Sequence, residues 1–202
     1  MSKEYVIDGK VVARWAKKQG GKPYPIFENV GYHYGDLGKA RDTNYFSIMS
    51  GRRSTGHFGN GTYFFGKKQE ENGYFTRKDR PIHKIDFSEY KLYKPKDKEE
   101  AYILHEGLKA INNREYNDPY FERLKDMLIK KKKTNIEIYG SLSKVIKEDE
   151  RISKSSVDIQ LESDSPSTIF MKELGYEGID VRHIEEYDNS TYGSVIYDLH
   201  NK

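Results

Sequence analysis

The sequence has no cysteine among its 202 residues. Disulfide bonds, thiolate nucleophiles and cysteine-ligated metals are therefore excluded. No apolar run approaches 18 residues, and the opening segment MSKEYVIDGKVV lacks the apolar core of a secretion signal. We therefore expect a soluble protein that is cytoplasmic where it is made.

Several motifs of common enzyme classes are also missing. The sequence has no GxxxxGK[ST], HExxH or GxSxG pattern, and GHFGNG has the wrong spacing for GxGxxG. The six histidines are scattered, without the spacing of a metal site. These gaps argue against a Walker-type phosphate loop, a zinc protease and a serine hydrolase, and we expect no metal.

The composition is that of a well-solvated globular protein. Hydrophobic residues make up 35% and charged residues 33%, but aromatics reach 13% with 17 tyrosines, which argues against a disordered chain. The net charge of +3 is too small to indicate nucleic-acid binding by itself. We expect a single domain over residues 1–202.

Hydrophobic periodicity changes along the chain. The first 22 residues suit a strand or a short helix, and the next part, to about Tyr93, favours strands and loops, with strands around ENVGYHYGD and PIHKIDFSEYKLY. Apolar residues recur at three- and four-residue steps over 99–111 and 119–129, which predicts two amphipathic helices. These belong to a helical insertion at about 97–150.

The C-terminal part returns to strands after one more helix. SDSPSTIFMKELG predicts a short helix with Asp164 or Ser165 as its cap, Pro166 in its first turn and Gly175 just beyond its end. Strands are expected at YEGIDVRHI and TYGSVIYDL. The fold class is therefore α+β, with helices packed around antiparallel sheets.

Four consecutive lysines, Lys130 to Lys133, follow the helix expected at 119–129. Cations are favourable at a helix C-terminus, so a solvated helix end is the preferred interpretation. The alternative is a patch that binds phosphate. In either case we expect these side chains to be exposed.

The segment STGHFGNGTYFFG, residues 54–66, has two interpretations. Asn60-Gly61 is a turn dipeptide that tolerates positive φ, and the residues after it have strand chemistry, so the segment predicts a hairpin. Alternatively, its glycines allow a ligand to approach the backbone beside an aromatic wall. A hairpin can also be the scaffold of such a site.

This segment, the preceding YHYGD, Tyr74 and the late GSVIYD together resemble the ADP-ribosyltransferase superfamily. The similarity is to its diphtheria-toxin and poly(ADP-ribose) polymerase-like branch, and LGYEGIDV resembles a segment of phage- and mobile-element-encoded members. The resemblance covers roughly residues 33–74 and 174–199. It implies two antiparallel β-sheets around an NAD-binding cleft, with NAD as a substrate.

The resemblance assigns roles to individual residues. His33 would bond the adenosine-side ribose, backbone groups after it would grip the carboxamide, and Tyr63 and Tyr74 would stack on the nicotinamide. A flat cationic ring suits such stacking. The NAD contacts implied are His33, Tyr34, Gly35, Ser54, Thr55, Gly59, Gly61, Tyr63 and Tyr74.

The sequence departs from the family pattern at two places. Tyr34 separates His33 from the glycine that normally follows the histidine directly. Gly193 stands where the family places the catalytic glutamate that stabilises the oxocarbenium ion. Glu186 is a candidate replacement, which makes His33, Tyr63 and Glu186 the expected catalytic residues, although Glu185 and Glu186 also read as ordinary solvated charges.

Three functions remain open. The first is a mono-ADP-ribosyltransferase, a toxin or anti-defence protein, that modifies a protein or nucleic acid, with a host defence component as one acceptor. The second is a catalytically impaired protein of the same fold that binds NAD or ADP-ribose or inhibits a partner. The third is a basic nucleic-acid-binding domain that uses tyrosine stacking and the four lysines.

Overall fold

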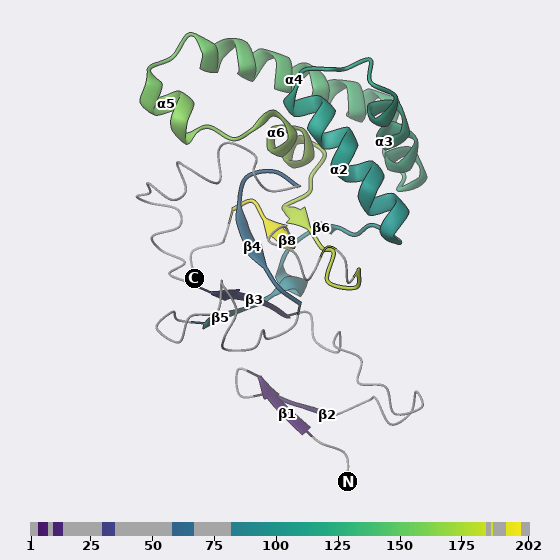
Figure 1. Cartoon of the computed structure of the whole chain (residues 1–202), viewed down its shortest axis with the longest axis vertical. Helices are drawn as coiled ribbons and strands as arrows, with labels where there is room; N and C mark the ends of the chain where they lie inside the picture. Colours follow the sequence, from purple (N-terminus) through teal and green to yellow (C-terminus); the bar gives the residue numbers. More distant parts are fainter. Residues whose placement is uncertain are drawn as a thin grey trace.

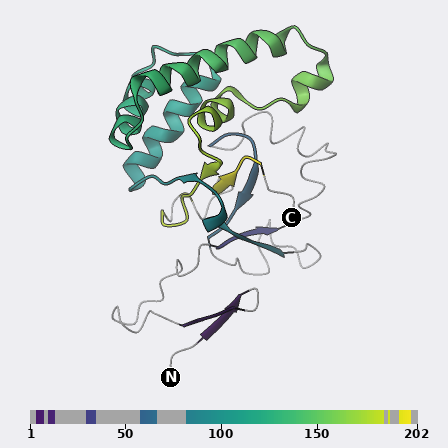
Figure 2. The ribbon, with the colours of Figure 1, turned by 180° about the vertical axis from the view of Figure 1, so that it is seen from behind.

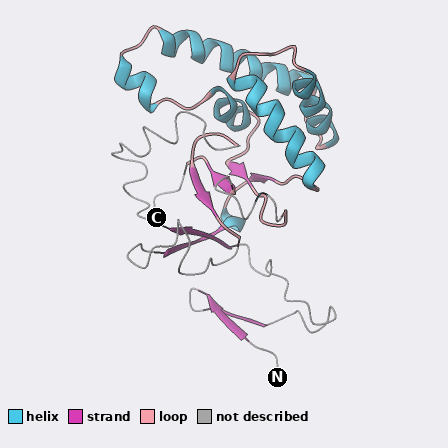
Figure 3. Cartoon of the chain, in the orientation of Figure 1, coloured by secondary structure: helices cyan, strands magenta, loops and turns pink. Residues whose placement is uncertain are grey.

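The computed structural model describes six stretches of the chain and one further residue. They are residues 4–7, 10–13, 30–34, 58–66, 82–184, 187 and 193–198. In Figures 1 and 3, short strands come first, a helical segment follows, and two short strands return near the C-terminus. The fold class is α+β, as the order of sequence patterns predicts.

The largest sheet has four strands in the order β4-β8-β7-β6. These strands are β4 (Thr62–Phe64), β8 (Ser194–Ile196), β7 (Gly178–Ile179) and β6 (Leu92–Tyr93). β4 and β7 are antiparallel to β8, but β6 runs parallel to β7. The expectation of purely antiparallel sheets is therefore wrong here, because the whole helical segment forms the crossover that a parallel pair needs.

A second sheet lies beside the first. β3 (Val30–Tyr34) pairs antiparallel with β5 (Ile82–Asp86), with His33 opposite His83. Two hydrogen bonds of 2.7 and 2.8 Å between the backbones of Tyr32 and Phe65 join β3 to the end of β4. This bridge places the two sequence motifs of the resemblance next to each other.

The N-terminal segment forms a hairpin of two strands. β1 (Glu4–Ile7) pairs antiparallel with β2 (Lys10–Ala13), with Ile7 opposite Lys10. The dipeptide between them in the sequence is Asp-Gly, a strong signal for a two-residue hairpin turn. Of the two expectations for this segment, the strand is correct for these residues.

The helical segment contains five α-helices. They are α2 (Lys98–Asn112), α3 (Pro119–Lys130), α4 (Asn135–Ser153), α5 (Val157–Glu162) and α6 (Pro166–Glu173). α2 and α3 confirm the two amphipathic helices of the sequence. The long α4 was not predicted individually, because its apolar residues lie on opposite faces: Ile138 is buried, whereas Ile136 is exposed.

The ends of α6 follow the sequence signals. Ser165 is the N-cap, Pro166 opens the first turn, and Gly175 has the positive φ of +89° that ends a helix in a Schellman motif. The cap is unusual in one respect. The Ser165 hydroxyl bonds the hydroxyls of Ser167 and Thr168, at 3.2 and 3.0 Å, instead of a backbone N–H.

The strand expected over PIHKIDFSEYKLY is two strands. Between β5 and β6 the chain makes a 3-10 helix at Phe87–Glu89, which begins where the Asp86 side chain accepts from the Ser88 amide at 2.9 Å. Local capping by an aspartate thus overrides the alternating pattern. The strands near the C-terminus are likewise shorter than the sequence predicts.

Helices and the four-stranded sheet share one hydrophobic core. A single cluster of buried side chains contains Leu104 and Leu108 of α2, Phe170 of α6, Ile179 of β7 and Val195 of β8. Figure 2 shows the helices gathered on one side of this sheet. The helical segment therefore contributes to the core that supports β8 and β4.

The described residues contain neither a membrane-spanning helix nor a metal-binding cluster. None of their helices is both long enough and apolar enough to cross a membrane. The same residues contain no group of three histidine or acidic side chains placed to hold a metal ion.

Candidate functional site

His33 and Tyr63 lie together although they are 30 residues apart in the sequence. The Nδ1 atom of His33 is 2.9 Å from the carbonyl oxygen of Tyr63. A carbonyl can only accept, so His33 donates from Nδ1, and its neutral form carries its proton there. The His33 ring also lies 5.6 Å from the ring of Phe64, which fixes it against β4.

The hydroxyl of Tyr63 closes the loop that precedes β4. It donates to the carbonyl oxygen of Gly59 at 2.6 Å and lies 3.4 Å from the amide nitrogen of Phe58. The ring is partly buried and packs against the main hydrophobic core. Tyr63 therefore has a structural role, and its fixed ring can still serve as the wall that the resemblance implies.

The glycines of this loop are required by contacts within the protein. Gly59 has a φ of +103°, and a Cβ there would lie 2.5 Å from the Thr168 hydroxyl of α6. A Cβ on Gly61 would collide with the backbone carbonyl oxygen of Ile196 in β8. At Gly59 and Gly61, α6 and β8 occupy the space that a side chain would fill, so packing within the protein accounts for these two glycines, and the approach of a ligand to this backbone stays a prediction.

The hairpin expectation also needs correction. The positive φ belongs to Gly59, whereas neither Asn60 nor Gly61 has one. Among the described residues β4 pairs only with β8, through Tyr63 opposite Val195. The dipeptide Asn60-Gly61 is therefore not a hairpin turn with two residues at positive φ.

Two further hydrogen bonds hold the same loop. The Tyr197 hydroxyl donates to the Phe58 carbonyl oxygen at 3.1 Å, and the Asn60 amide donates to the Thr168 hydroxyl at 2.8 Å. Burial raises the pKa of Tyr197 well above its ordinary value, so this tyrosine stays protonated and remains a donor. Three elements thus fix the backbone of residues 58–60 before any ligand binds.

The start of β8 lies opposite the end of β4, with Ser194 paired with Phe64, and it lacks a carboxylate. Gly193, where the resemblance implies a catalytic glutamate, is buried. The next residue, Ser194, is fully buried, and its hydroxyl accepts from the Val181 amide at 2.9 Å. The structure therefore retains the departure that the sequence shows at this position.

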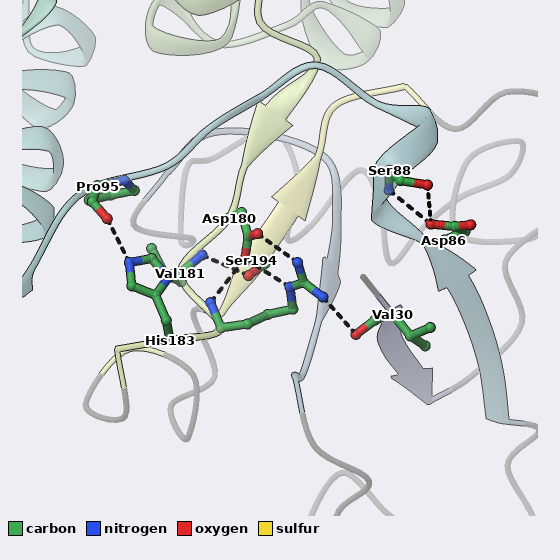
Figure 4. Close-up of polar contacts among 9 residues, drawn as sticks. Val30, Asp86, Ser88, Pro95, Asp180, Val181, His183 and Ser194 are labelled. Carbon is green, nitrogen blue, oxygen red and sulfur yellow. Dashed lines mark hydrogen bonds and ion pairs between the residues drawn. The ribbon is translucent and has the colours of Figure 1, made fainter. Parts of the chain in front are cut away.

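A buried ion pair, which the sequence analysis missed, stands next to β8. The guanidinium of Arg182 binds both carboxylate oxygens of Asp180, at 2.9 and 2.7 Å, and the carbonyl oxygen of Val30 in β3 at 3.2 Å. Asp180 and Val30 are labelled in Figure 4. The guanidinium also lies 4.4 Å from the ring centre of Phe87. The only sequence signal is the D-x-R spacing, which does not reveal burial.

The pair determines what Asp180 can do. Burial opposes its ionisation, but the hydrogen bonds and charge of Arg182 outweigh burial and hold the pKa of this carboxyl below its ordinary value. Asp180 is therefore an ionised carboxylate near β8 with both oxygens committed to Arg182. It can replace the missing glutamate only if this pair breaks.

A second contact beside the pair fixes the segment after β7. The Nε2 atom of His183 lies 2.6 Å from the carbonyl oxygen of Pro95, in the connection between β6 and α2 (Figure 4). Together with the Val181 amide bond to Ser194, it anchors residues 181–183 on both sides. The ion pair thus lies on a rigid support.

The remaining site residues expected from the sequence can be placed only in part. The backbone of Tyr34 belongs to β3, paired with Ile82, but its side chain is not described. The others lie outside the described residues: Gly35, Ser54, Thr55, Tyr74, Glu185 and Glu186. The structure brings together His33, Tyr63, the glycine loop and β8.

The four lysines sit at the end of α3. Lys130, Lys131 and Lys132 are exposed and Lys133 is partly buried. Lys131 donates to the carbonyl oxygen of Lys94 at 3.0 Å, and Lys133 lies over the ring of Tyr176 at 5.2 Å. The expected exposure is thus confirmed for three of the four side chains, two of the ammonium groups are fixed by neighbours, and both interpretations of the cluster stay predictions.

Comparisons with known proteins add no relative. No family model, curated protein or solved structure matches the chain.

Proposed function

We propose that the chain is a mono-ADP-ribosyltransferase that binds NAD beside β3, β4 and β8. The proposal starts from the sequence resemblance, and one observation carries it further. His33 and Tyr63, which the resemblance assigns to one ligand, lie within hydrogen-bonding distance of each other. The β8 strand, where the family places its catalytic residue, pairs with the strand that contains Tyr63.

The proposed reaction breaks the bond between C1′ of the ribose and the nicotinamide nitrogen. The bonding electrons leave with nicotinamide, which becomes neutral, and C1′ acquires oxocarbenium character. A nucleophilic atom of the acceptor then bonds to C1′ and loses its proton. The ring of Tyr63 would orient the nicotinamide by stacking, and a carboxylate would stabilise the developing positive charge.

The acceptor follows from the resemblance alone. Because one segment resembles phage- and mobile-element-encoded members, we infer a macromolecular acceptor in a bacterial host, either a protein or a nucleic acid. This acceptor could belong to a defence system.

A second function has its own support, namely binding of NAD or ADP-ribose without transfer. Gly193 supplies no carboxylate at the family's catalytic position, and Asp180 is committed to Arg182. Such a protein would act by binding and inhibiting a partner protein, or by sequestering NAD or ADP-ribose. Both functions need the same NAD contacts and differ only in chemistry.

The test uses NAD labelled in its adenylate part, with the full chain and a bacterial lysate. Transfer predicts label on a macromolecule together with release of free nicotinamide. Binding without transfer predicts heat in a calorimetric titration but no nicotinamide. Nucleic-acid binding that falls steeply with salt, without any NAD binding, would favour the third alternative of the sequence analysis.

Two variants make the test specific to the site. Tyr63→Ala should weaken NAD binding about tenfold, from lost stacking and apolar contact. Tyr102→Ala is the matched control, because Tyr102 is an exposed tyrosine of α2. If the parent chain binds no NAD at about 1 mM ligand, both the transferase function and the binding of NAD without transfer are wrong.

A further inference from the structure

The outer face of α4 carries apolar side chains that the core does not use. Ile136 is 86% exposed, Tyr139 50% and Ile146 40%. With Ser143 and Glu150 these residues follow one another at steps of three and four, so all five lie along one stripe of the helix, the α4 stripe. Ile138, Leu142 and Val145 lie on the opposite face and are buried.

The α4 stripe is open to solvent at the edge of the molecule. In Figures 1 and 2, α4 lies on the outer side of the helical segment, away from the strands. A Cβ built on Gly140, which flanks the stripe, meets nothing within 4 Å. Another helix could therefore approach α4 closely over most of its 19 residues, which span about 28 Å.

We propose that the α4 stripe binds the same stripe of a second copy of this chain, with the two α4 helices antiparallel. We place the two-fold axis that relates the two antiparallel α4 helices at the level of Ser141. A residue before Ser141 in one copy then faces the residue that lies equally far after Ser141 in the other copy. Ile136 then faces Ile146 of the other copy, and the bulky Tyr139 faces the small Ser143. The stripe is thus complementary to itself: apolar Ile136 meets apolar Ile146, and a large tyrosine meets a small serine.

The charges fit the same register. Lys132 belongs to the turn before α4, so its long side chain would be near Glu150 at the C-terminal end of the other copy's α4, and symmetry makes this pair twice. Both side chains are exposed. A parallel arrangement would instead place Lys132 opposite Lys132 and Glu150 opposite Glu150, which repel. The charge pattern therefore selects a second, antiparallel copy as the occupant.

One pair of helices buries less surface than a standard permanent interface. The dimer should therefore be weak and depend on concentration. This inference is independent of the proposed NAD chemistry, because α4 contributes no residue to the region around His33 and Tyr63.

The experiment is sedimentation equilibrium of the full chain from about 10 µM to 1 mM. The parent chain should show a monomer–dimer equilibrium, and Ile136→Glu should raise its Kd at least tenfold. Val157→Glu is the matched control, because Val157 is an exposed apolar residue of α5 outside the stripe. It should leave the Kd unchanged, and circular dichroism checks that each variant folds.

A charge exchange tests the register. Lys132→Glu and Glu150→Lys should each raise the Kd about three- to tenfold, because each variant opposes like charges twice. The double variant should restore the parent Kd. A monomeric parent chain at 1 mM would refute the dimer and leave the α4 stripe for a different partner, and a double variant weaker than both single variants would refute the antiparallel register.

Discussion

Replacing Tyr63 with phenylalanine removes a single oxygen atom and separates the two roles of this residue. The hydroxyl donates to the Gly59 carbonyl oxygen at 2.6 Å, and Gly59 is buried. Without that donor the carbonyl loses its short hydrogen bond in a place with little access to water. The ring, which would stack on nicotinamide, stays.

The expected cost follows from these contacts. A buried acceptor left without its donor costs about 1–3 kcal/mol, and the long contact to the Phe58 amide adds little. The loop keeps its bonds from Tyr197 and to Thr168, so the cost should lie in the lower half of this range, about 1–2 kcal/mol. For a chain of 202 residues this corresponds to a Tm lower by about 2–8 °C.

Thermal unfolding followed by circular dichroism measures this change, with and without NAD. Tyr102→Phe is the control, because Tyr102 is 45% exposed on α2 and its hydroxyl loses at most a solvated contact. We expect Tyr63→Phe to have a lower Tm than the parent chain but to show the same rise in Tm when NAD is added. An unchanged Tm would show that the Gly59 contact contributes nothing, and a lost NAD response would show that the hydroxyl itself binds ligand.

Four further predictions concern single residues. Gly61→Ala should lower the free energy of unfolding in urea by more than about 2 kcal/mol, because the added Cβ meets the Ile196 carbonyl oxygen. Gly140→Ala, at an open helical site of α4, should raise this free energy by about 1 kcal/mol. Equal effects of the two variants would contradict the packing argument. Asp180→Asn should cost about 3–5 kcal/mol by leaving Arg182 buried without a counter-charge. Because the folded pKa of Asp180 is depressed, the parent chain has the full benefit of this pair above about pH 4 and loses it as the pH falls toward the folded pKa, so the variant's unfolding free energy should depend less on acid pH. Lys132→Gly should stabilise by about 0.5–1 kcal/mol in chemical unfolding, because Lys132 has a φ of 66° just after α3. Lys130→Gly, at the last residue of α3, should instead destabilise by up to about 1 kcal/mol. Glu186→Gln should leave the calorimetric Kd for NAD unchanged and abolish transfer; full activity of this variant would exclude Glu186 as the replacement carboxylate.

Short sequence patterns predicted those helices whose boundaries and amphipathic faces depend on residues within the same segment. The periodicity of α2 and α3, and the Pro166 and Gly175 ends of α6, are properties of short segments and reappear in the structure. α4 was hidden because its apolar residues serve two faces, of which the core uses one. A hydrophobic count cannot separate these faces without the surrounding fold.

Features that depend on distant partners could not be predicted in the same way. The parallel pairing of β6 with β7 joins residues on opposite sides of the helical segment. Gly61 is needed because Ile196 lies next to it, and Arg182 is buried because Val30 and Phe87 surround it. The meeting of His33 with Tyr63 was expected from the resemblance, and no local pattern contains it.

The chemistry of the proposed site depends on the origin of one negative charge. The backbone around Tyr63 is fixed in advance by α6, β8 and Tyr197, so the site needs little reorganisation to hold a flat ring. Gly193 provides no charge, and releasing Asp180 would leave Arg182 buried without its partner. Breaking the Asp180–Arg182 ion pair costs more free energy than a typical single contact with a ligand contributes. If the chain is a transferase, we therefore expect its carboxylate to come from Glu186, from the acceptor or from a partner.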